Sequence, residues 1–205
     1  MKTKFLIVTC ETQLDFSYYQ KDFFIIGVER GCLDLIGKNI KMDLAVSDFD
    51  QVLASELTQI QEQAKSFEKL DCQKDNLDGT YAIKKAYELG ATEIVFVAKP
   101  TNRVDMNLTI LEYCYKYHVK FLNDNTVAYC LGKGTSTLSF AQYQGYTYIT
   151  FFPVHETLLT ISGLKYNIED LHLLPNSTRA FSNEFIPNTA GKITTTKPVL
   201  VIFNK

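Results

Sequence analysis

The 205-residue sequence has no tryptophan, no C-x-x-C pair and no excess of basic residues. Its 21 lysines and arginines face 23 aspartates and glutamates, and this balance does not favour nucleic-acid binding, which relies on basic residues to neutralise phosphates. The five cysteines are an odd number without the spacing of zinc ligands or of a disulfide framework, so we expect reduced thiols. The sequence therefore argues against a nucleic-acid-binding protein and against a disulfide-stapled one.

Long apolar runs are also missing. A membrane-spanning helix needs about 18 to 20 apolar residues, whereas the apolar runs here are short segments such as residues 23–28. Near the N-terminus, the apolar run at residues 5–8 is interrupted by Thr9, Cys10 and Glu11 before the core of a signal peptide could form. We therefore expect a cytoplasmic protein that does not insert into a membrane.

The first 124 residues contain alternating strand and helix patterns. Such alternation is typical of an α/β domain with a mainly parallel sheet and flanking helices, a Rossmann-like arrangement. The predicted strands are residues 4–8, 23–28, 43–47, 93–98 and 119–122. The predicted helices are residues 52–70, 80–89 and 105–117, and in the first of them Leu53, Leu57, Ile60, Ala64 and Phe67 recur at helical spacing on an expected core face.

The helical period disappears after Asn125. Short runs rich in threonine, tyrosine and phenylalanine then alternate with glycine, proline and asparagine turns, which predicts a smaller all-β sandwich. Its strands are expected at residues 126–131, 137–140, 147–152, 157–161, 170–174, 191–196 and 199–203. We therefore expect two domains, an α/β domain at residues 1–124 and a β-sandwich domain at residues 125–205.

Acidic residues follow the predicted strand that ends at Ser47. Ligands of open α/β sheets bind beyond the carboxyl ends of the strands, so Asp48 and Asp50 are candidate site residues. Residues two apart on an extended chain point the same way, and Mg²⁺ prefers one or two carboxylates with water and phosphate oxygens. In the alternative interpretation, one aspartate caps the following helix and the other is only solvated.

Two further polar clusters precede predicted helices. Asp78 is a candidate third metal carboxylate, with Lys74 beside a phosphate, or else the N-cap of the helix that follows. Arg103 is suited to bind a phosphate through two parallel hydrogen bonds, and Asp105 to orient it or to bind a ribose hydroxyl. Alternatively, Arg103 and Asp105 form an ordinary surface ion pair, and Asp105 caps its helix.

Taken in order, several motifs resemble those of the thiamine pyrophosphokinase family over nearly the whole chain. Residues 27–31 (GVERG) resemble its early G-x-D-x-G segment, and residues 43–50 (DLAVSDFD) resemble its P-D-hydrophobic-G-D-F-D motif. Residues 74–78 (KDNLD) are similar to its K/Q-D-x-T-D, and residues 103–105 (RVD) to its G-G-R-x-D-H. In the β-rich half, residues 163–166 (GLKY) and 182–185 (SNEF) are similar to segments of its thiamine-binding domain.

The resemblance implies Mg²⁺-dependent transfer of a diphosphoryl group from ATP to the thiamine hydroxyl, which yields thiamine diphosphate and AMP. It also implies a homodimer whose site lies between the α/β domain of one subunit and the β-domain of the other. The catalytic metal carboxylates would be Asp48, Asp50 and Asp78. The nucleotide contacts would be Glu29, Lys74, Asp75, Asp105 and the catalytic Arg103, and the thiamine contacts would be Ser182 and Asn183.

The sequence departs from the family pattern at several of these positions. Glu29 replaces the aspartate of the first motif, Ser47 replaces the glycine before D-F-D, and Met106 replaces a histidine. The glycines that precede the family's arginine are also absent before Arg103. Two alternatives therefore stay open. One is a diphosphokinase for another heterocyclic alcohol such as a hydroxymethylpterin, and the other is an inactive thiamine or nucleotide binder.

Overall fold

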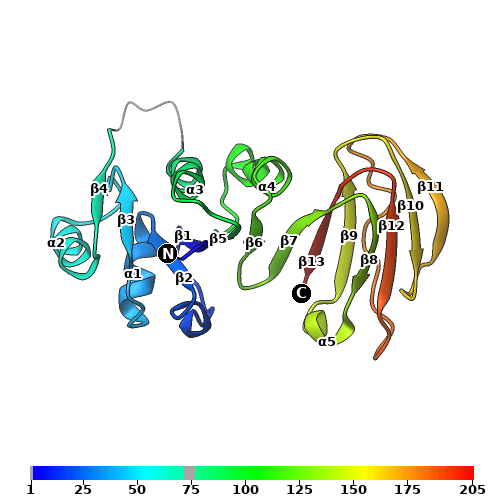
Figure 1. Ribbon diagram of the computed structural model, residues 1–205, viewed down its shortest axis with the longest axis horizontal. Coiled ribbons are helices and arrows are strands. Elements are labelled where there is room, and N and C mark those ends of the chain that lie inside the picture. Colours follow the sequence, from blue (N-terminus) through cyan, green and yellow to red (C-terminus); the bar gives the residue numbers. More distant parts are fainter. Residues whose placement is uncertain (1, 72–76) are drawn as a thin grey trace. The chain divides into compact units, whose positions relative to one another are not determined.

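The computed structural model describes residues 2–71 and 77–205 (Figure 1). The chain divides into two compact units. Unit 1 contains the chain up to Thr109 together with Phe121–Asp124, and unit 2 contains Ile110–Lys120 and Asn125–Lys205. In the described part of the chain, none of the helices has both the length and the apolar character needed to cross a membrane.

Unit 1 is built on a parallel sheet with the strand order β4-β3-β2-β1-β5-β6. Parallel pairing is observed between β1 and β2, β1 and β5, β2 and β3, and β3 and β4. The strands are β1 (Lys4–Val8), β2 (Phe23–Gly27), β3 (Leu44–Ser47), β4 (Phe67–Lys69), β5 (Glu93–Val97) and β6 (Lys120–Leu122). The central strands are nearly continuous apolar runs, as expected where both faces of a parallel sheet are covered.

Helices flank this sheet and complete its core. They are α1 (Arg30–Gly37), α2 (Ala54–Gln63), α3 (Asp78–Glu88) and the first half of α4 (Val104–Lys116), with a short 3₁₀ helix at Ser17–Tyr19. Cys32 and Leu35 of α1 and Ile60 of α2 are fully buried in one cluster with the strand residues Val8 and Ala45. Burial of this apolar surface is the main stabilising contribution to unit 1.

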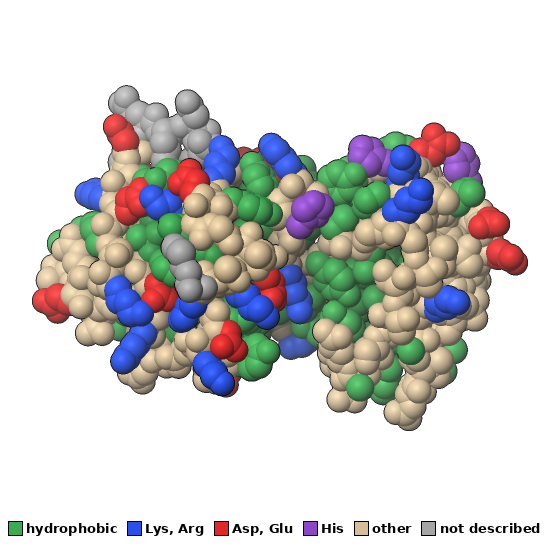
Figure 2. Space-filling model, in the orientation of Figure 1, with side chains coloured by type: hydrophobic (Ala, Val, Ile, Leu, Met, Phe, Trp, Pro, Cys, Tyr) green, Lys and Arg blue, Asp and Glu red, His purple; other side chains and the backbone are tan. Residues whose placement is uncertain are grey.

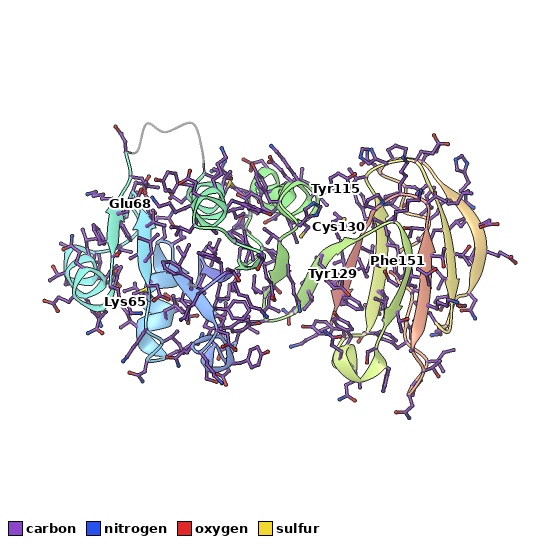
Figure 3. All side chains as sticks on the ribbon, viewed as in Figure 1. Lys65, Glu68, Tyr115, Tyr129, Cys130 and Phe151 are labelled. Atoms are coloured by element: carbon purple, nitrogen blue, oxygen red, sulfur yellow. The ribbon has the colours of Figure 1, made fainter. Side chains whose placement is uncertain are left out.

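Unit 2 is an antiparallel sandwich. One sheet contains β7, β13 and β9 in that order, and the other has the order β11-β10-β12-β8, with these neighbouring strands antiparallel. The strands are β7 (Thr126–Leu131), β8 (Gly134–Leu138), β9 (Tyr148–Pro153), β10 (Thr157–Ser162), β11 (Ile168–Leu173), β12 (Gly191–Thr195) and β13 (Val199–Asn204), and a short helix, α5, covers Phe140–Tyr143. Phe151 of β9, labelled in Figure 3, is fully buried.

Aromatic rings fill much of the sandwich interior. Phe203 of β13 lies parallel to Tyr143 of α5, with ring centroids 4.0 Å apart, and Phe185 also stacks on Phe203. The Tyr143 hydroxyl donates to the Tyr129 hydroxyl at 3.0 Å. Burial raises the pKa of Tyr129, and the Tyr143 hydroxyl adds to that shift. Some of the phenylalanine and tyrosine rings of this tryptophan-free sequence thus belong to the core of unit 2.

The predicted fold class is confirmed, because a mainly parallel α/β sheet precedes an antiparallel sandwich. Most predicted strand bounds agree with the structure within two residues. The strand expected at residues 137–140 instead begins at Gly134, and Phe140 opens α5. The sequence patterns did not predict α1, β4 or α5.

The helix predicted at residues 52–70 is wrong over its second half. Helix α2 ends at Gln63, Ala64 is its C-cap in an extended conformation, and Phe67 begins β4. Leu53, placed on the expected core face, is 69 % exposed. The two predicted N-caps are also wrong, because α3 begins at Asp78 after the N-cap Leu77, and α4 begins at Val104 so that Asp105 lies inside its first turn.

Candidate active site

Three carboxylates converge at the carboxyl end of the parallel sheet. Strands β2 and β3 are neighbours, so the segments that follow them leave from the same edge. Glu29 follows β2, Asp48 follows β3, and Asp78 is the first residue of α3. One carboxylate oxygen from each of these residues lies within 4.8 Å of the other two. The predicted meeting of Asp48 and Asp78 is therefore observed, with Glu29 as the third member.

Glu29 accepts hydrogen bonds from the turn that follows β3. Its Oε1 accepts the amide of Phe49 at 2.7 Å and the hydroxyl of Ser47, and its Oε2 accepts the amide of Gln51 at 3.3 Å. Both Glu29 and Phe49 have a positive φ, 49° and 57° respectively, which is uncommon for residues other than glycine. Such strained conformations persist where surrounding contacts fix them, and they often mark functional sites.

Ser47 connects two of the three carboxylates. Its side chain is fully buried at the end of β3, and its Oγ lies 2.9 Å from Asp78 Oδ2 as well as beside Glu29 Oε1. Sequence reasoning counted Ser47 in the polar cluster after the strand but gave it no role, and otherwise noted it as a departure from a glycine. The signal that could have identified Ser47 is a hydroxyl residue at the last position of a buried strand, directly before the segment Asp-Phe-Asp.

Burial raises the pKa of the Glu29 carboxyl. The Ser47 hydroxyl opposes that rise, the neighbouring Asp48 carboxyl adds to it, and the amides of Gln51 and Phe49 oppose it. Carboxylates packed this closely repel one another unless a proton or a cation lies between them. The group is therefore suited to a hard divalent cation with oxygen ligands.

Asp50 lies outside this group. The sequence analysis assumed an extended chain from Asp48 to Asp50, but Phe49 turns the backbone and the Asp50 amide donates to Asp48 Oδ1 at 3.3 Å. Asp48 is half-buried and Asp50 is exposed. The carboxylate of Asp50 has no hydrogen bond or ion pair among the described residues, so it is available to a ligand.

A polar link between β4 and α3 positions the start of α3. Glu68 of β4, labelled in Figure 3, accepts hydrogen bonds from Tyr81 and forms an ion pair with Lys85 at 3.0 Å. Glu68 also pairs in register with Val46 of β3. This link ties α3 to the sheet through Tyr81 in its first half and Lys85 in its last turn, and so helps to hold Asp78 beside Ser47.

The structure describes only some of the predicted nucleotide contacts. Lys74 and Asp75 lie outside the described residues. Arg103 pairs with Asp105, whose Oδ2 is 2.5 Å from Nη2, and both side chains are exposed, at 70 and 64 %. Arg103 holds the pKa of Asp105 below its ordinary value. The observed contact is the surface ion pair that sequence reasoning left open, and a phosphate contact by Arg103 stays a prediction.

The predicted thiamine contacts Ser182 and Asn183 lie next to β9 in unit 2. Ser182 is exposed and has a φ of 57°. Asn183 is buried, its Oδ1 accepts the amides of Tyr166 and Glu184, and its Nδ2 donates to the carbonyl of Tyr166 at 2.8 Å. The side-chain amide of Asn183 therefore links the segment around Tyr166 to the segment that contains Asn183.

We expect Asn183→Ala to destabilise the protein by about 2 to 3 kcal/mol, because buried polar groups left without partners cost about 1 to 3 kcal/mol each. Ser182→Ala is the matched control, and we expect it to change stability by less than about 0.5 kcal/mol. Urea denaturation of both variants measures the difference. Equal stability of Asn183→Ala and wild type would contradict the structural role of this amide.

Two family models match the chain, one over each part. The model described as thiamin pyrophosphokinase, catalytic domain, matches residues 17–127. The model described as thiamin pyrophosphokinase, vitamin B1 binding domain, matches residues 135–200. The chain belongs to the thiamin pyrophosphokinase family. Thiamine diphosphokinase activity, the transfer of pyrophosphate from ATP to thiamine, is therefore its function, with ATP as co-substrate.

Individual members of the thiamin pyrophosphokinase family agree with this assignment. The thiamine pyrophosphokinase of Bacillus subtilis (strain 168) is 25 % identical over an alignment of 184 residues that covers 86 % of this chain and 85 % of that protein. The crystal structure of the Bacillus subtilis protein has a TM-score of 0.84 at 23 % identity and covers 98 % of this chain and 99 % of its own. The structure of the Candida albicans thiamin pyrophosphokinase has a TM-score of 0.81 at 15 % identity, and the match covers 99 % of this chain and 89 % of that one. These two structures support the fold.

Proposed function

We propose that the chain transfers the diphosphoryl group with Mg²⁺ held by Asp48, Asp50 and Asp78. The observation that supports this most is the convergence of Asp48 and Asp78 with Glu29 at the carboxyl edge of the sheet. Asp50 adds an exposed carboxylate two residues from Asp48. Hard oxygen ligands of this kind are those that Mg²⁺ prefers, with the remaining positions left to water and phosphate oxygens.

The bound ion would neutralise charge on the phosphate oxygens during the transfer. The task of the chain itself is to place the thiamine hydroxyl in line with the β-phosphorus of ATP and to hold both substrates there. For the nucleotide, the family resemblance points to Glu29, Lys74, Asp75, Arg103 and Asp105. The exposed Arg103 guanidinium has the donor geometry for a phosphate once it leaves Asp105.

Thiamine is a cation with two aromatic rings, and exposed aromatic faces offer it stacking and cation–π attraction. In unit 2, Tyr166 and Phe181 are exposed beside the predicted contacts Ser182 and Asn183. We accordingly assign catalysis to residues 1–124 and thiamine binding to residues 125–205. The match to the vitamin B1 binding domain favours thiamine over a pterin.

We also propose a cytoplasmic homodimer. Figure 2 shows apolar side chains on the visible face of unit 2. The large apolar residues of unit 2 that are exposed include Tyr148, Tyr166, Phe181 and Ile186. Exposed apolar surface of this kind is typical of protein interfaces. Light scattering coupled to size-exclusion chromatography tests the dimer, and a single monomer mass at assay concentrations would contradict it.

The decisive experiment measures AMP formation from ATP and Mg²⁺ with and without thiamine. We expect AMP only when thiamine is present, and we expect Asp48→Ala to abolish it while the circular dichroism spectrum stays that of the wild type. Chelation of Mg²⁺ should have the same effect as the substitution.

Two results would contradict this proposal. Thiamine binding without AMP would identify an inactive binder, with the glycines missing before Arg103 as the first suspects. AMP formation that depends on a hydroxymethylpterin and not on thiamine would assign the other heterocyclic substrate.

A further inference from the structure

Both oxygens of Glu29 are already engaged by the chain. Oε1 accepts the Phe49 amide and the Ser47 hydroxyl, and Oε2 accepts the Gln51 amide. All three donors belong to residues 47–51, the turn that carries Asp48 and Asp50. The side chain is buried, with 7 % of the residue exposed. An ionised carboxylate has about four lone-pair sites, and the turn takes three of those of Glu29, so the side chain holds the turn in place and has little capacity left for a metal ion.

Ser47 extends this contact to α3. Its Oγ lies within hydrogen-bond distance of both Glu29 Oε1 and Asp78 Oδ2, and its single hydrogen is donated to one of them at a time, although these carboxylates come from segments 49 residues apart in the sequence. Ser47 is fully buried, and among the described residues its hydroxyl has these two carboxylates as hydrogen-bond partners. Ser47 is therefore placed to fix the distance between Asp78 and the turn after β3.

We propose that Glu29 and Ser47 act together as positioning residues, which we call the Glu29–Ser47 bracket, and that neither is a ligand of the metal. Glu29 sets the conformation of the turn that presents Asp48 and Asp50, and Ser47 sets the position of Asp78. This inference rests on the Mg²⁺ site of the proposed function and deepens it. It assigns Glu29 a role other than the nucleotide contact that the family resemblance implies.

The backbone conformation at Phe49 allows its amide to meet Glu29. Glu29 approaches the turn from the segment after β2, and Phe49 meets it with a left-handed backbone that aims its amide at Oε1. Residues that orient metal ligands without touching the metal typically change affinity by 10- to 100-fold when replaced. Substitutions in the bracket are therefore expected to lower metal affinity measurably, but by less than the loss of a metal ligand does.

The first test measures Mn²⁺ affinity by electron paramagnetic resonance on the full chain. Glu29→Gln and Asp48→Asn each remove one carboxylate charge, so the difference between them isolates direct coordination. We expect Glu29→Gln to retain at least about tenfold more affinity than Asp48→Asn, because its amide oxygen still accepts the Phe49 amide. Equal losses in the two variants would make Glu29 a ligand and overturn the inference.

Ser47→Ala tests the second half of the bracket without any change of charge. We expect its Mn²⁺ affinity to fall by roughly tenfold, as for other residues that orient metal ligands. Ser136→Ala, at a partly buried strand serine of unit 2, is the matched control and should bind Mn²⁺ as the wild type does. Unchanged affinity in Ser47→Ala would overturn the role assigned to Ser47.

A second measurement is independent of the metal. In metal-free protein, hydrogen exchange at the Phe49 amide should be slow in wild type and in Glu29→Gln, and fast in Glu29→Ala. Equally fast exchange in wild type and in Glu29→Ala would overturn the bracket even if the metal site is correct. Conversely, a wild type that binds no Mn²⁺ would contradict the metal site of the proposed function, and hydrogen exchange would still decide the bracket.

Discussion

Replacing Asp50 with asparagine is expected to lower thiamine-dependent AMP formation by roughly 100-fold or more, because metal stabilisation of transferring charge is worth several kcal/mol and each 1.4 kcal/mol is about tenfold. The fold should be unaffected, since the Asp50 side chain is exposed and makes no hydrogen bond or ion pair among the described residues. Asparagine keeps the size of the side chain and an oxygen ligand but removes the charge.

The dependence on Mg²⁺ concentration separates a metal ligand from a general contact. If Asp50 holds the ion, Asp50→Asn needs more Mg²⁺ for half-maximal activity, and part of the lost turnover returns at high Mg²⁺. Asp22→Asn is the control, because Asp22 is an exposed aspartate in the turn just before β2. It should show wild-type activity and wild-type Mg²⁺ dependence.

A different result at Asp50 would redefine the ligand set. An active Asp50→Asn enzyme with unchanged Mg²⁺ dependence would contradict the assignment of Asp50. Together with a severe defect in Glu29→Gln, it would favour the three carboxylates that already lie within 4.8 Å of one another. The two substitutions therefore distinguish the ligand set suggested by the sequence motif from the one suggested by proximity.

The strands of unit 1 were predictable because burial on both faces leaves a clear apolar signature. Lys4–Val8 was predicted without error, and the other strands of this sheet that the sequence identified differ by one residue. Helix α1 was not predicted because Gly31 and Gly37 give its sequence a low helix propensity. Its apolar residues Cys32 and Leu35 pack on the sheet, and tertiary packing outweighs propensity there.

The overrun of the predicted helix after Gln63 has a similar cause. Ala64 and Phe67 continue the helical spacing of α2 by coincidence, and no glycine or proline marks the end of the helix. In the structure, Phe67 pairs with Ala45 of β3 and its ring stacks on Phe49 at 4.9 Å. A three-residue edge strand is too short to give an alternating strand pattern in the sequence, so β4 is recognised only by its pairing with β3.

The site was predictable to the extent that strand order determines it. Residues that follow the strands of a parallel sheet lie at one edge, and this made Asp48 a candidate, whereas Asp78 was a candidate because its polar cluster precedes a helix and matches a family motif. The exposed orientation of Asp50 and the bonding of Ser47 depend on the positive φ of Phe49, which no periodic pattern encodes. The amide of Asn183 likewise has partners that only the folded chain brings to it.

The close contact of α1 with β1 makes Gly31→Ala the substitution with the largest expected effect on stability. A Cβ at Gly31 would lie 2.0 Å from the carbonyl oxygen of Val8 and 2.7 Å from the amide nitrogen of Thr9. These are backbone atoms at the end of a central strand, so β1 cannot move aside without breaking hydrogen bonds of the sheet, and α1 has to shift instead. Overpacking in a well-packed core costs about 1 to 3 kcal/mol and occasionally more, and we expect about 3 kcal/mol or more here.

Gly37→Ala is the matched control in the same helix, because a Cβ there meets nothing within 4 Å. We expect it to be neutral or to stabilise by up to about 1 kcal/mol, since alanine has a higher helix propensity than glycine. Urea denaturation of both variants measures the contrast, and a Gly31→Ala protein as stable as Gly37→Ala would contradict the packing described.

The consequence of Gly31→Ala for the site follows from the position of Glu29, two residues earlier. If α1 moves away from β1 to admit the methyl group, Glu29 moves with it, and its bonds to the turn at Phe49 lengthen. Gly31→Ala protein that still folds should therefore lose hydrogen-exchange protection at the Phe49 amide and bind Mn²⁺ more weakly, whereas Gly37→Ala should not. Such a result would connect the glycine of the early motif to the metal site through Glu29, because no atom of Gly31 needs to touch the ion.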